Sequence, residues 1–600
     1  MGQLGAYSLT ATGLVPAGDD REILALARQI AHHTLPHEAF YRAPGYPAVL
    51  ALGLKLGVPD AGLLLFARGL NALCHLLTAA LVGRLARSLW ASRAAGLTAA
   101  ALVGFNPVLL HFAGDALDIT LAITLMTAGI VSLVHAQRGR CSPGLASFWL
   151  SLAALCRPQL VPLLLLPPLL SLYLPCRKGR NLLRALAPAA LIFGCFGLVN
   201  QQLADDFRLL PWQGAYNLWA ANHPGANGRY FEQTLSVDSY DPAANTARLE
   251  SEALYLQREP TAPQDYPSVT RYWQAQALAS IRESPAAWLA LMGQKLRYLL
   301  NNEEQYNNKT YAFYKARSRW LGPNPLCWAL VLTCGVAGAA VGWKRREFRL
   351  LLLAIGLCAG GVLLYYVSDR FRAPLVPLLS VLAGGITQLR FSPDSGRAAG
   401  WALTALVLAL LPVAYDPRET LIQDHMMVAA SATALGRHAE ALGELAAAAE
   451  TNSKRPTLVA LSCIVRFNAW LADAGPSKSA WIENCQQAAA GSASARLLSA
   501  HAAWLAGNVQ AAVVGWREAA VPGGPDEATA LAALSVARAL TEAEQRRFID
   551  LANQGSESVL AVLANAGDEE RRQQLLMVQG PLRAESAVRA AKRLWGKPAP

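Results

Sequence analysis

The sequence predicts an all-α protein made of a polytopic transmembrane helical bundle, outer helices lying along the membrane, and a C-terminal helical-repeat domain. The 600 residues are 53% hydrophobic and 16% charged, with a mean hydropathy of +0.25, which is too apolar for soluble domains of this total length. Nearly all long apolar runs precede Tyr415, and the remainder is Ala-rich and polar at helical spacing. We therefore expect a membrane domain over 1–415 and a soluble domain over 416–600.

About ten apolar runs in the first domain have roughly the 16 to 22 residues that a helix needs to cross a bilayer. We expect spans over 62–83, 95–112, 119–136, 143–157, 159–175, 185–203, 325–343, 350–367, 373–389 and 399–415.

Alternate connections between these runs carry Lys and Arg, and the positive-inside rule places them in the cytoplasm. The first loop (18–61), the long loop (204–324) and the C-terminal domain are then outside, which predicts a multi-pass protein of the inner (plasma) membrane with a periplasmic repeat domain. Because the formal charge of +12 is spread over these short loops, nucleic-acid binding is not expected. The basic connections contain Arg84, Arg87, Arg93, Arg138, Arg140, Arg177, Lys178, Arg180, Arg184, Lys344, Arg345, Arg346, Arg349, Arg390 and Arg397.

Residues 1–17 contain neither a signal peptide nor an apolar run long enough to span, although the topology places them outside. We interpret LGAYSLTATGLV as the remnant of a first helix, so the intact protein would have one more span and a cytoplasmic start.

The first outer loop opens with GDDREILALARQIAHH, which predicts a short amphipathic helix on the membrane surface. Asp19 and Glu22 fit a capping box, whereas the functional interpretation makes Asp19 or Asp20 a general base at the outer boundary. The expected apolar stripe consists of Ile23, Leu26, Ala27 and Ile30.

Further charges stand at predicted outer helix ends. Arg42 precedes a Pro-Gly turn and is either a phosphate contact or an interfacial anchor. Asp115 and Asp118 share the turn HFAGDALDITL, where a carboxylate so close to a bilayer indicates function, and helix capping by Asp118 is the alternative. Arg157 in CRPQLVP is expected to bind a phosphate or a structural carboxylate, with simple anchoring as the other interpretation.

A series of strings resembles, in order, the GT-C superfamily of polyprenyl-phosphate-sugar-dependent glycosyltransferases, close to its protein O-mannosyltransferase and aminoarabinose-transferase branch. The resemblance covers most of residues 19–380. The strings are DDREILALARQI, YRAPGYPAVLAL, ARGLNALCHLLTAALVGRLARSLW, GFNPVLLHFAGDALDITL, LAALCRPQLVPLLLLPPL, GAYNLWAANHPGANGRYF, SPAAWLALMGQKLRYLLNNEEQYNN and SDRFRAPLVPLL.

This resemblance implies sugar transfer from a polyprenyl-phosphate donor to a protein, lipid or glycan acceptor. Asp19 would assist the nucleophile, with Asp20 in reserve, and Asp115 matches the second acid better than Asp118 does. Outer cations would stabilise the departing phosphate, and the long loop would line the sugar site. Family members differ in using a divalent cation, so that cofactor stays open and no metal ligand is assigned. The donor-phosphate candidates are Arg42, Arg157, Lys295, Arg297, Arg370 and Arg372, and the sugar or acceptor candidates are Tyr216, Asn217, Asn222 and Asp118.

The chain also departs from the family pattern. Ile23 stands where members often have Tyr, and Asp115 replaces what is often Glu, which shortens its reach. The long loop has a plainer interpretation as an aromatic belt at the interface. Glu303 and Glu304 are either a solvated acidic pair or part of the cavity.

Two stretches of the tail, ASATALGRHAEALGELAAAAE and SAHAAWLAGNVQAAVVGWREAA, resemble tetratricopeptide-like repeats. Such a domain would bind a protein partner on its concave surface, or would serve as a stabilising cap. Cys463 and Cys485 are expected to form a disulfide in an oxidising compartment or to be two buried thiols.

Three other functions fit parts of the pattern. A transporter or flippase also has many spans, but it would place charges near the bilayer centre, commonly in two related halves. An O-antigen ligase or polymerase would have its long outer loop later in the chain. A non-catalytic membrane scaffold presenting the repeat domain would not need Asp19.

Overall fold

The computed structural model describes residues 2–173, 178–229, 245–303, 305, 309–391, 394–413, 418–452, 455–475, 477–488, 493–520, 526–579 and 581–595. All regular structure in these residues is helical, which confirms the predicted all-α class. The chain divides into two compact units: unit 1 holds 1–13, 18–232 and 251–420, and unit 2 holds 14–17, 233–250 and 421–600. The expected boundary near Asp416 falls in 414–417, outside the described residues.

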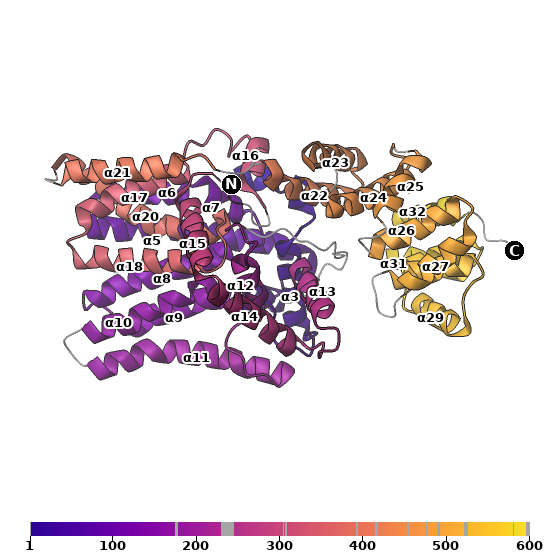
Figure 1. Cartoon of the computed structure of the whole chain (residues 1–600), viewed down its shortest axis with the longest axis horizontal. Coiled ribbons are helices and arrows are strands. Elements are labelled where there is room, and N and C mark those ends of the chain that lie inside the picture. The colour runs from indigo at the N-terminus through magenta and orange to yellow at the C-terminus, as the bar shows by residue number, and fades with distance from the viewer. Residues whose placement is uncertain are drawn as a thin grey trace. The chain divides into compact units, whose positions relative to one another are not determined.

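Unit 1 contains a bundle of neighbouring, roughly parallel helices (Figure 1). Helices α5 and α6 pack together, α8 packs on α9, α9 on α11, and α17 on both α20 and α21. The bundle consists of α5 (Leu63–Trp90), α6 (Arg93–Gly104), α7 (Pro107–Ala113), α8 (Ile119–Gln137), α9 (Pro143–Cys156), η2 (Pro158–Leu165), α10 (Leu166–Tyr173), α11 (Lys178–Ala204), α17 (Trp328–Gly342), α18 (Arg346–Leu363), α19 (Asp369–Arg372), α20 (Leu375–Ala383), η3 (Gly384–Phe391) and α21 (Ser395–Leu410).

Every segment expected to span is helical over most of its length, but fewer helices than expected could cross a bilayer alone. Within the described residues, three helices are long and apolar enough: Asp60–Trp90, Ile119–Gln137 and Gly179–Ala204. A fourth candidate is the pair Arg93–Gly104 and Pro107–Ala113, which is bent by 52°. By length and composition the expectation of about ten full-length spans is therefore wrong.

Proline accounts for part of the shortfall, because it removes a backbone donor and breaks the helical hydrogen-bond ladder. Pro107 follows the break between α6 and α7. Pro158 begins the 3₁₀ segment η2 and Pro162 lies inside it, and this segment takes up the first part of the run 159–175 that the sequence predicts as one span. The average hydropathy of each run predicts a single span, whereas in the structure the helix is interrupted within the run.

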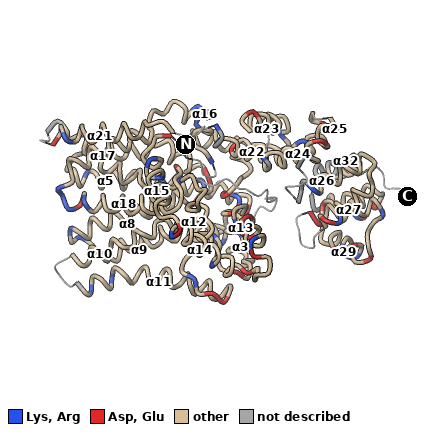
Figure 2. The backbone as a smooth tube through the Cα atoms, viewed as in Figure 1, with Lys and Arg blue, Asp and Glu red and all other residues tan. Residues whose placement is uncertain are grey.

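The basic connections of the bundle meet at one end of unit 1 (Figure 2). Arg138 donates to Glu347 at 3.0 Å and to the Ser88 hydroxyl at 2.8 Å, and Arg345 donates to the carbonyl of Leu89 at 2.8 Å. Three connections that the sequence assigns to one side of the membrane are thus in direct contact. The connection 174–177 lies outside the described residues.

The predicted first outer loop contains two helices, α3 (Asp19–His32) and α4 (Gly45–Lys55), preceded by the short α1 (Gly2–Tyr7) and α2 (Ala11–Leu14). Helix α3 begins where the sequence predicts. Its buried face includes Ile23 and Ala27 as expected, but Leu24 and Ala31 complete it, while Leu26 and Ile30 are only half-buried. The long loop 204–324 contains α12 (Gly214–Asn222), α13 (Thr246–Arg258), α14 (Tyr266–Glu283), α15 (Pro285–Leu300) and α16 (Tyr311–Arg317).

Unit 2 is a succession of short helices that pack on their neighbours in the chain. The turns after the small-residue helices use Gly436 and Gly507, whose φ values of 70° and 84° favour glycine. Cys463 and Cys485 form a disulfide, which decides between the two alternatives that the sequence left open. The helices are α22 (Arg418–Ala434), α23 (His438–Asn452), α24 (Pro456–Leu471), α25 (Lys478–Ala488), α26 (Ala493–Leu505), α27 (Val509–Ala519), α28 (Glu527–Val536), α29 (Glu542–Asn553), α30 (Glu557–Asn565), α31 (Glu569–Gln579) and α32 (Pro581–Trp595).

Candidate functional site

Helix α3 opens on its charged residues without using them as caps. Its N-cap is Gly18, whose φ of 61° lies in the left-handed region, and no side chain caps the helix. The capping-box interpretation of Asp19 and Glu22 is therefore wrong, because both carboxylates instead accept from Arg42, at 2.7 and 2.6 Å. The acidic side chains at the start of α3 therefore bind Arg42.

Three arginines and three carboxylates form a buried ion-pair network. Arg370 joins Asp19 to Asp118, contacting both carboxylates. Arg157 donates to the same Asp118 oxygen at 2.9 Å. With Arg42 and Glu22 the network has three cations and three acids, so its formal charge is zero.

This network assembles because distant segments approach closely. A Cβ on Gly45, the first residue of α4, would lie 2.8 Å from the backbone nitrogen of Cys156, so glycine lets α4 reach the end of α9 beside Arg157. Asp118 stands at the N-cap of α8, but its side chain makes no capping bond. Its carboxylate serves the arginines, so the capping alternative for Asp118 is wrong and the carboxylate-partner interpretation of Arg157 is confirmed.

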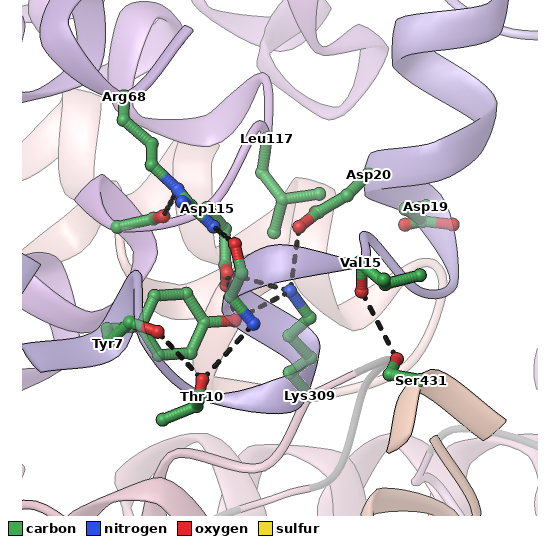
Figure 3. Close-up of polar contacts among 12 residues, drawn as sticks. Tyr7, Thr10, Val15, Asp19, Asp20, Arg68, Asp115, Leu117, Lys309 and Ser431 are labelled. Carbon is green, nitrogen blue, oxygen red and sulfur yellow. Dashed lines mark hydrogen bonds and ion pairs between the residues drawn. The ribbon is translucent and has the colours of Figure 1, made fainter. Parts of the chain in front are cut away.

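Asp20, next to Asp19 on α3, belongs to a second buried group (Figure 3). The Nζ of Lys309 lies 2.7 Å from Asp20 Oδ2, 2.7 Å from Asp115 Oδ1 and 3.1 Å from the Tyr7 hydroxyl. Tyr7 in turn donates its proton to Asp115 Oδ1 at 2.7 Å. The side chains of Lys309 and Asp115 are 0% exposed and that of Asp20 is 1% exposed, so bulk water does not screen these charges.

Two residues near the start of α5 hold the turn that carries Asp115. Arg68 donates to the carbonyls of Gly114 and Gly13, at 2.8 and 2.7 Å. Asn71 donates to the carbonyl of Asp115 at 2.7 Å. The backbone around this acid is thus fixed from a neighbouring helix, which is the usual way in which a site residue is positioned.

The three acids differ in how readily they hold a proton. Burial raises the pKa of Asp20 to about 6, although Lys309 acts in the opposite direction. Burial also favours a neutral Asp19, but Arg42 and Arg370 outweigh it and hold the pKa of Asp19 below its usual 3.8. The pKa of Asp115 is lowered as well, because Lys309 outweighs the effect of burial. Among these three acids, Asp20 is therefore the one that exchanges a proton nearest to neutral pH.

The remaining cation candidates bind other partners. Lys295 is buried against the Asn222 side chain and the Leu363 carbonyl, both at 3.1 Å, and burial lowers its pKa to about 7. Arg372 pairs with Asp369 and lies over the Trp328 ring. Arg297 donates to the carbonyl of Pro412.

The sugar-site candidates of the long loop are likewise engaged elsewhere. Tyr216 is a buried member of an aromatic cluster, with its ring 4.9 Å from that of Trp273. Asn222 donates to the carbonyl of Leu364 and accepts from Lys295. Asn217 is half-buried on α12, and its backbone bonds to Gln213. Glu303 is half-buried, and Glu304 lies outside the described residues.

Sequence reasoning missed Lys309, Tyr7, Arg68 and Asn71. Tyr7 stands in the stretch interpreted as a helix remnant, and Lys309 follows a polar run with no periodic or motif signal. The one feature of the sequence that could have identified Arg68 is its position inside an apolar run, because a charged side chain there usually binds a polar partner in the protein interior.

The chain matches no protein-family profile and no curated protein sequence. Within the described residues, no three or more His, Cys, Asp or Glu side chains are placed to hold a metal ion.

The buried groups of the site offer one carboxyl that can exchange a proton, which is Asp20, and a fixed carboxylate beside it, which is Asp115. A cluster of buried guanidinium groups lies on the adjacent Asp19 and on Asp118.

Proposed function

We propose that the chain is a membrane glycosyltransferase that moves a sugar from a polyprenyl-phosphate donor to an acceptor at the extracytoplasmic face. The observation that carries this proposal is the convergence of acids from α3 and the α7–α8 turn with Arg42, Arg157 and Arg370 from three separate segments. Transfer of a sugar from a phosphate needs both a group that takes the acceptor's proton and cations that stabilise the leaving group.

The arginines suit a departing phosphate. Each of Arg42, Arg157 and Arg370 keeps a buried Nε–H that meets no acceptor among the described residues. Guanidinium groups bind phosphate oxygens through charge-assisted hydrogen bonds, and a buried site strengthens these bonds. Arg370 and Arg42 also pair with Asp19, so a phosphate bound to these arginines would lie next to the start of α3, which carries Asp19 and Asp20.

The arrangement of charges along the bundle supports an outer site and an inner basic face. Arg68, which holds the acid-bearing turn, and Ser88, which contacts Arg138, are on the same helix α5. They are about 20 residues apart, or roughly 30 Å at the helical rise, close to the thickness of the hydrocarbon core. The site and the basic connections thus lie roughly 30 Å apart along α5, a separation that suits an outer site and an inner basic face.

The disulfide supports the same orientation for unit 2. Disulfides persist in oxidising compartments such as the periplasm and are rare in the cytosol. A Cys463–Cys485 bond therefore fits a C-terminal unit outside the membrane, as the loop charges predict. The shorter apolar helices, such as α9, α17 and α21, would cross the bilayer together with the three long ones as one packed bundle.

Unit 2 would act as a tetratricopeptide-like recruiter of a protein partner. If residues 421–600 are deleted, we expect transfer to a native acceptor to fall while transfer to a small artificial acceptor is kept. Equal loss for both acceptors would identify unit 2 as a stabilising cap. Transfer assays with paired acceptors measure the difference.

The decisive test is transfer in membranes supplied with a panel of polyprenyl-phosphate sugars. We expect the parent to transfer one of them, Asp115→Asn to lose roughly 100-fold or more in rate, and Arg157→Gln to raise the KM for the donor. Arg138→Met, which removes an ion pair at the basic end of the bundle, is the matched control and should transfer normally.

A folded parent that transfers no sugar from any donor, or an Asp115→Asn variant with an unchanged rate, would overturn the proposal. Substrate uptake by the parent into sealed vesicles, without transfer, would favour a carrier instead.

A further inference from the structure

Lys309 occupies an unusual position for a lysine, because its ammonium lies between two buried carboxylates. An ammonium has three hydrogens to donate, and Nζ has three oxygen neighbours, on Asp20, Asp115 and Tyr7. These contacts use the whole donor capacity of the group. The cation is thus fully bound by the chain itself.

A divalent cation, which the family resemblance left open, does not fit this place. The point between Asp20 and Asp115 is where an ion bridging the two acids would lie, and Lys309 Nζ is already there. Magnesium and calcium can complete their oxygen shells with water, but an ion bridging these two acids would have to displace the Lys309 ammonium, which lies 2.7 Å from an oxygen of each. The donor set is that of an ammonium site.

We propose that Lys309 is the resident cation of this acid pair, and that it holds Asp20 ready to take the proton of the acceptor. This inference rests on the proposed transfer of a sugar. It makes Lys309 a positioning residue, which acts through Asp20, and it assigns the catalytic proton transfer to Asp20 in place of Asp19.

The pair leaves two oxygens for a ligand. Asp20 Oδ1 and Asp115 Oδ2 are buried, and neither has a hydrogen-bond partner among the described residues. Buried carboxylate oxygens are normally satisfied, so two such oxygens on neighbouring acids indicate a missing donor. A hydroxyl or an amine of an acceptor molecule supplies that donor.

The number of donors on each acid separates their roles. Asp115 Oδ1 accepts from both Lys309 and Tyr7, and Asp19 accepts from two arginines. Among the described residues, Asp20 accepts a side-chain hydrogen bond from Lys309 alone. Because each donated hydrogen bond favours the ionised carboxylate, Asp20 is the easiest of the three to protonate, in agreement with its raised pKa.

The chemical step balances within this site. The acceptor oxygen or nitrogen bonds to the anomeric carbon while the bond from that carbon to the phosphate oxygen breaks. The electron pair leaves with the polyprenyl phosphate, and the acceptor proton passes to Asp20 Oδ1. Lys309 keeps its charge throughout. The other titratable or charged groups around this acid group are Asp19, Asp115, Tyr7, Tyr46, Arg68, His111 and Tyr314.

Metal dependence and the pH profile of the full-length protein test the inference together. We expect transfer by the parent to be unchanged within twofold by EDTA or by added Mg²⁺ or Mn²⁺, and its Tm to be equally insensitive. Lys309→Ala should lose about 100-fold or more in rate. Its rate-pH midpoint should rise by about one unit or more, because the lost cation favours the ionised form of Asp20.

Two further variants separate positioning from a merely structural role. Propylammonium should restore part of the lost rate in Lys309→Ala and bring the midpoint back down. Lys309→Arg keeps a cation and should keep a midpoint near that of the parent even with a reduced rate. Should Lys309→Ala fail to fold, the arginine variant and the EDTA titration decide.

The inference is overturned if EDTA abolishes transfer by the parent and a divalent ion restores it, or if the midpoint stays fixed when the cation is removed. These outcomes require a parent that transfers sugar, so they are distinct from failure of the proposed function, in which the parent transfers none.

Discussion

The two units differ in the buried polar groups at their centres. Unit 1 encloses ionised groups, with Lys309 between two aspartates that are almost fully buried. Unit 2 builds its interior from Ala, Leu and Trp, and its buried His501 is a neutral acceptor for the Trp516 indole at 2.7 Å. A disulfide adds a covalent link in the same unit.

This difference separates stability from chemistry. Buried ion pairs contribute little net stability, because desolvation offsets their attraction, so their concentration in unit 1 indicates a task other than folding. The apolar interior and the disulfide of unit 2 are what a stable support requires. Substitutions in unit 1 that keep the shape of the side chain and leave each buried charge a partner should therefore change the reaction more than the fold, and substitutions in the apolar interior of unit 2 should do the reverse.

The largest expected effect is on the reaction, from Asp20→Asn. This change removes the proton acceptor and should lower the transfer rate by roughly 100- to 10,000-fold. The fold should be kept, because Asn has the shape of Asp and Lys309 retains Asp115 as its counter-ion. Burial raises the pKa of Asp20 to about 6, so the contribution of this carboxyl group to stability falls as the pH rises from 3.8 to about 6. A thermal melt at pH 8 should show a cooperatively folded variant. A variant that loses activity only by unfolding would break the contrast between the units.

Loss of the disulfide should have the largest effect on unit 2. Replacing Cys463 and Cys485 together by Ala should lower the stability of this unit by about 2–4 kcal/mol, because the unfolded chain is no longer constrained. Hydrogen exchange followed by mass spectrometry would show faster exchange in peptides from 455–488. Protection of α3 and α5 should stay unchanged.

Acid should destabilise unit 2 through His501. Burial lowers the pKa of this imidazole from 6.5 to about 3, so the folded state favours the neutral form. Its stabilising contribution is present above pH 6.5 and is lost as the pH falls toward 3, by roughly 1.4 kcal/mol per pH unit. His501→Gln, which keeps an acceptor for Trp516 and cannot be charged, should flatten this dependence in hydrogen exchange of 493–520. An identical slope in parent and variant would contradict the assignment.

The smallest effect is expected at the start of α29. The Thr541 hydroxyl accepts from the Glu544 backbone, and the Glu544 carboxylate accepts from the Thr541 backbone at 2.7 Å. Thr541→Ala should cost about 1 kcal/mol by removing this capping box. Chemical denaturation followed by exchange in 541–553 would measure the loss, and transfer by unit 1 should not change.

Much of the local structure could be predicted from the sequence. Helix α3 begins at the predicted Asp19, and helices occupy every apolar run assigned as a span, because apolar periodicity acts within a few residues. Chemistry-bearing residues were also found where charges stand at helix ends, including Asp19, Arg42 and Asp118. Where a proline lies inside an apolar run, as Pro162 does, average hydropathy carries no information about the break.

The sequence by itself determined the helical class, the positions of the helices, and the residue types available for chemistry. The tertiary structure alone decided their partners: Lys309 meets Asp20 across 289 residues, and the adjacent Asp19 and Asp20 enter different groups. The physical reason is that helix formation depends on neighbours three or four residues away, whereas burial and Coulombic interaction depend on distance in space. Whether an acid binds arginine or lysine, and how tightly it holds a proton, follows from packing.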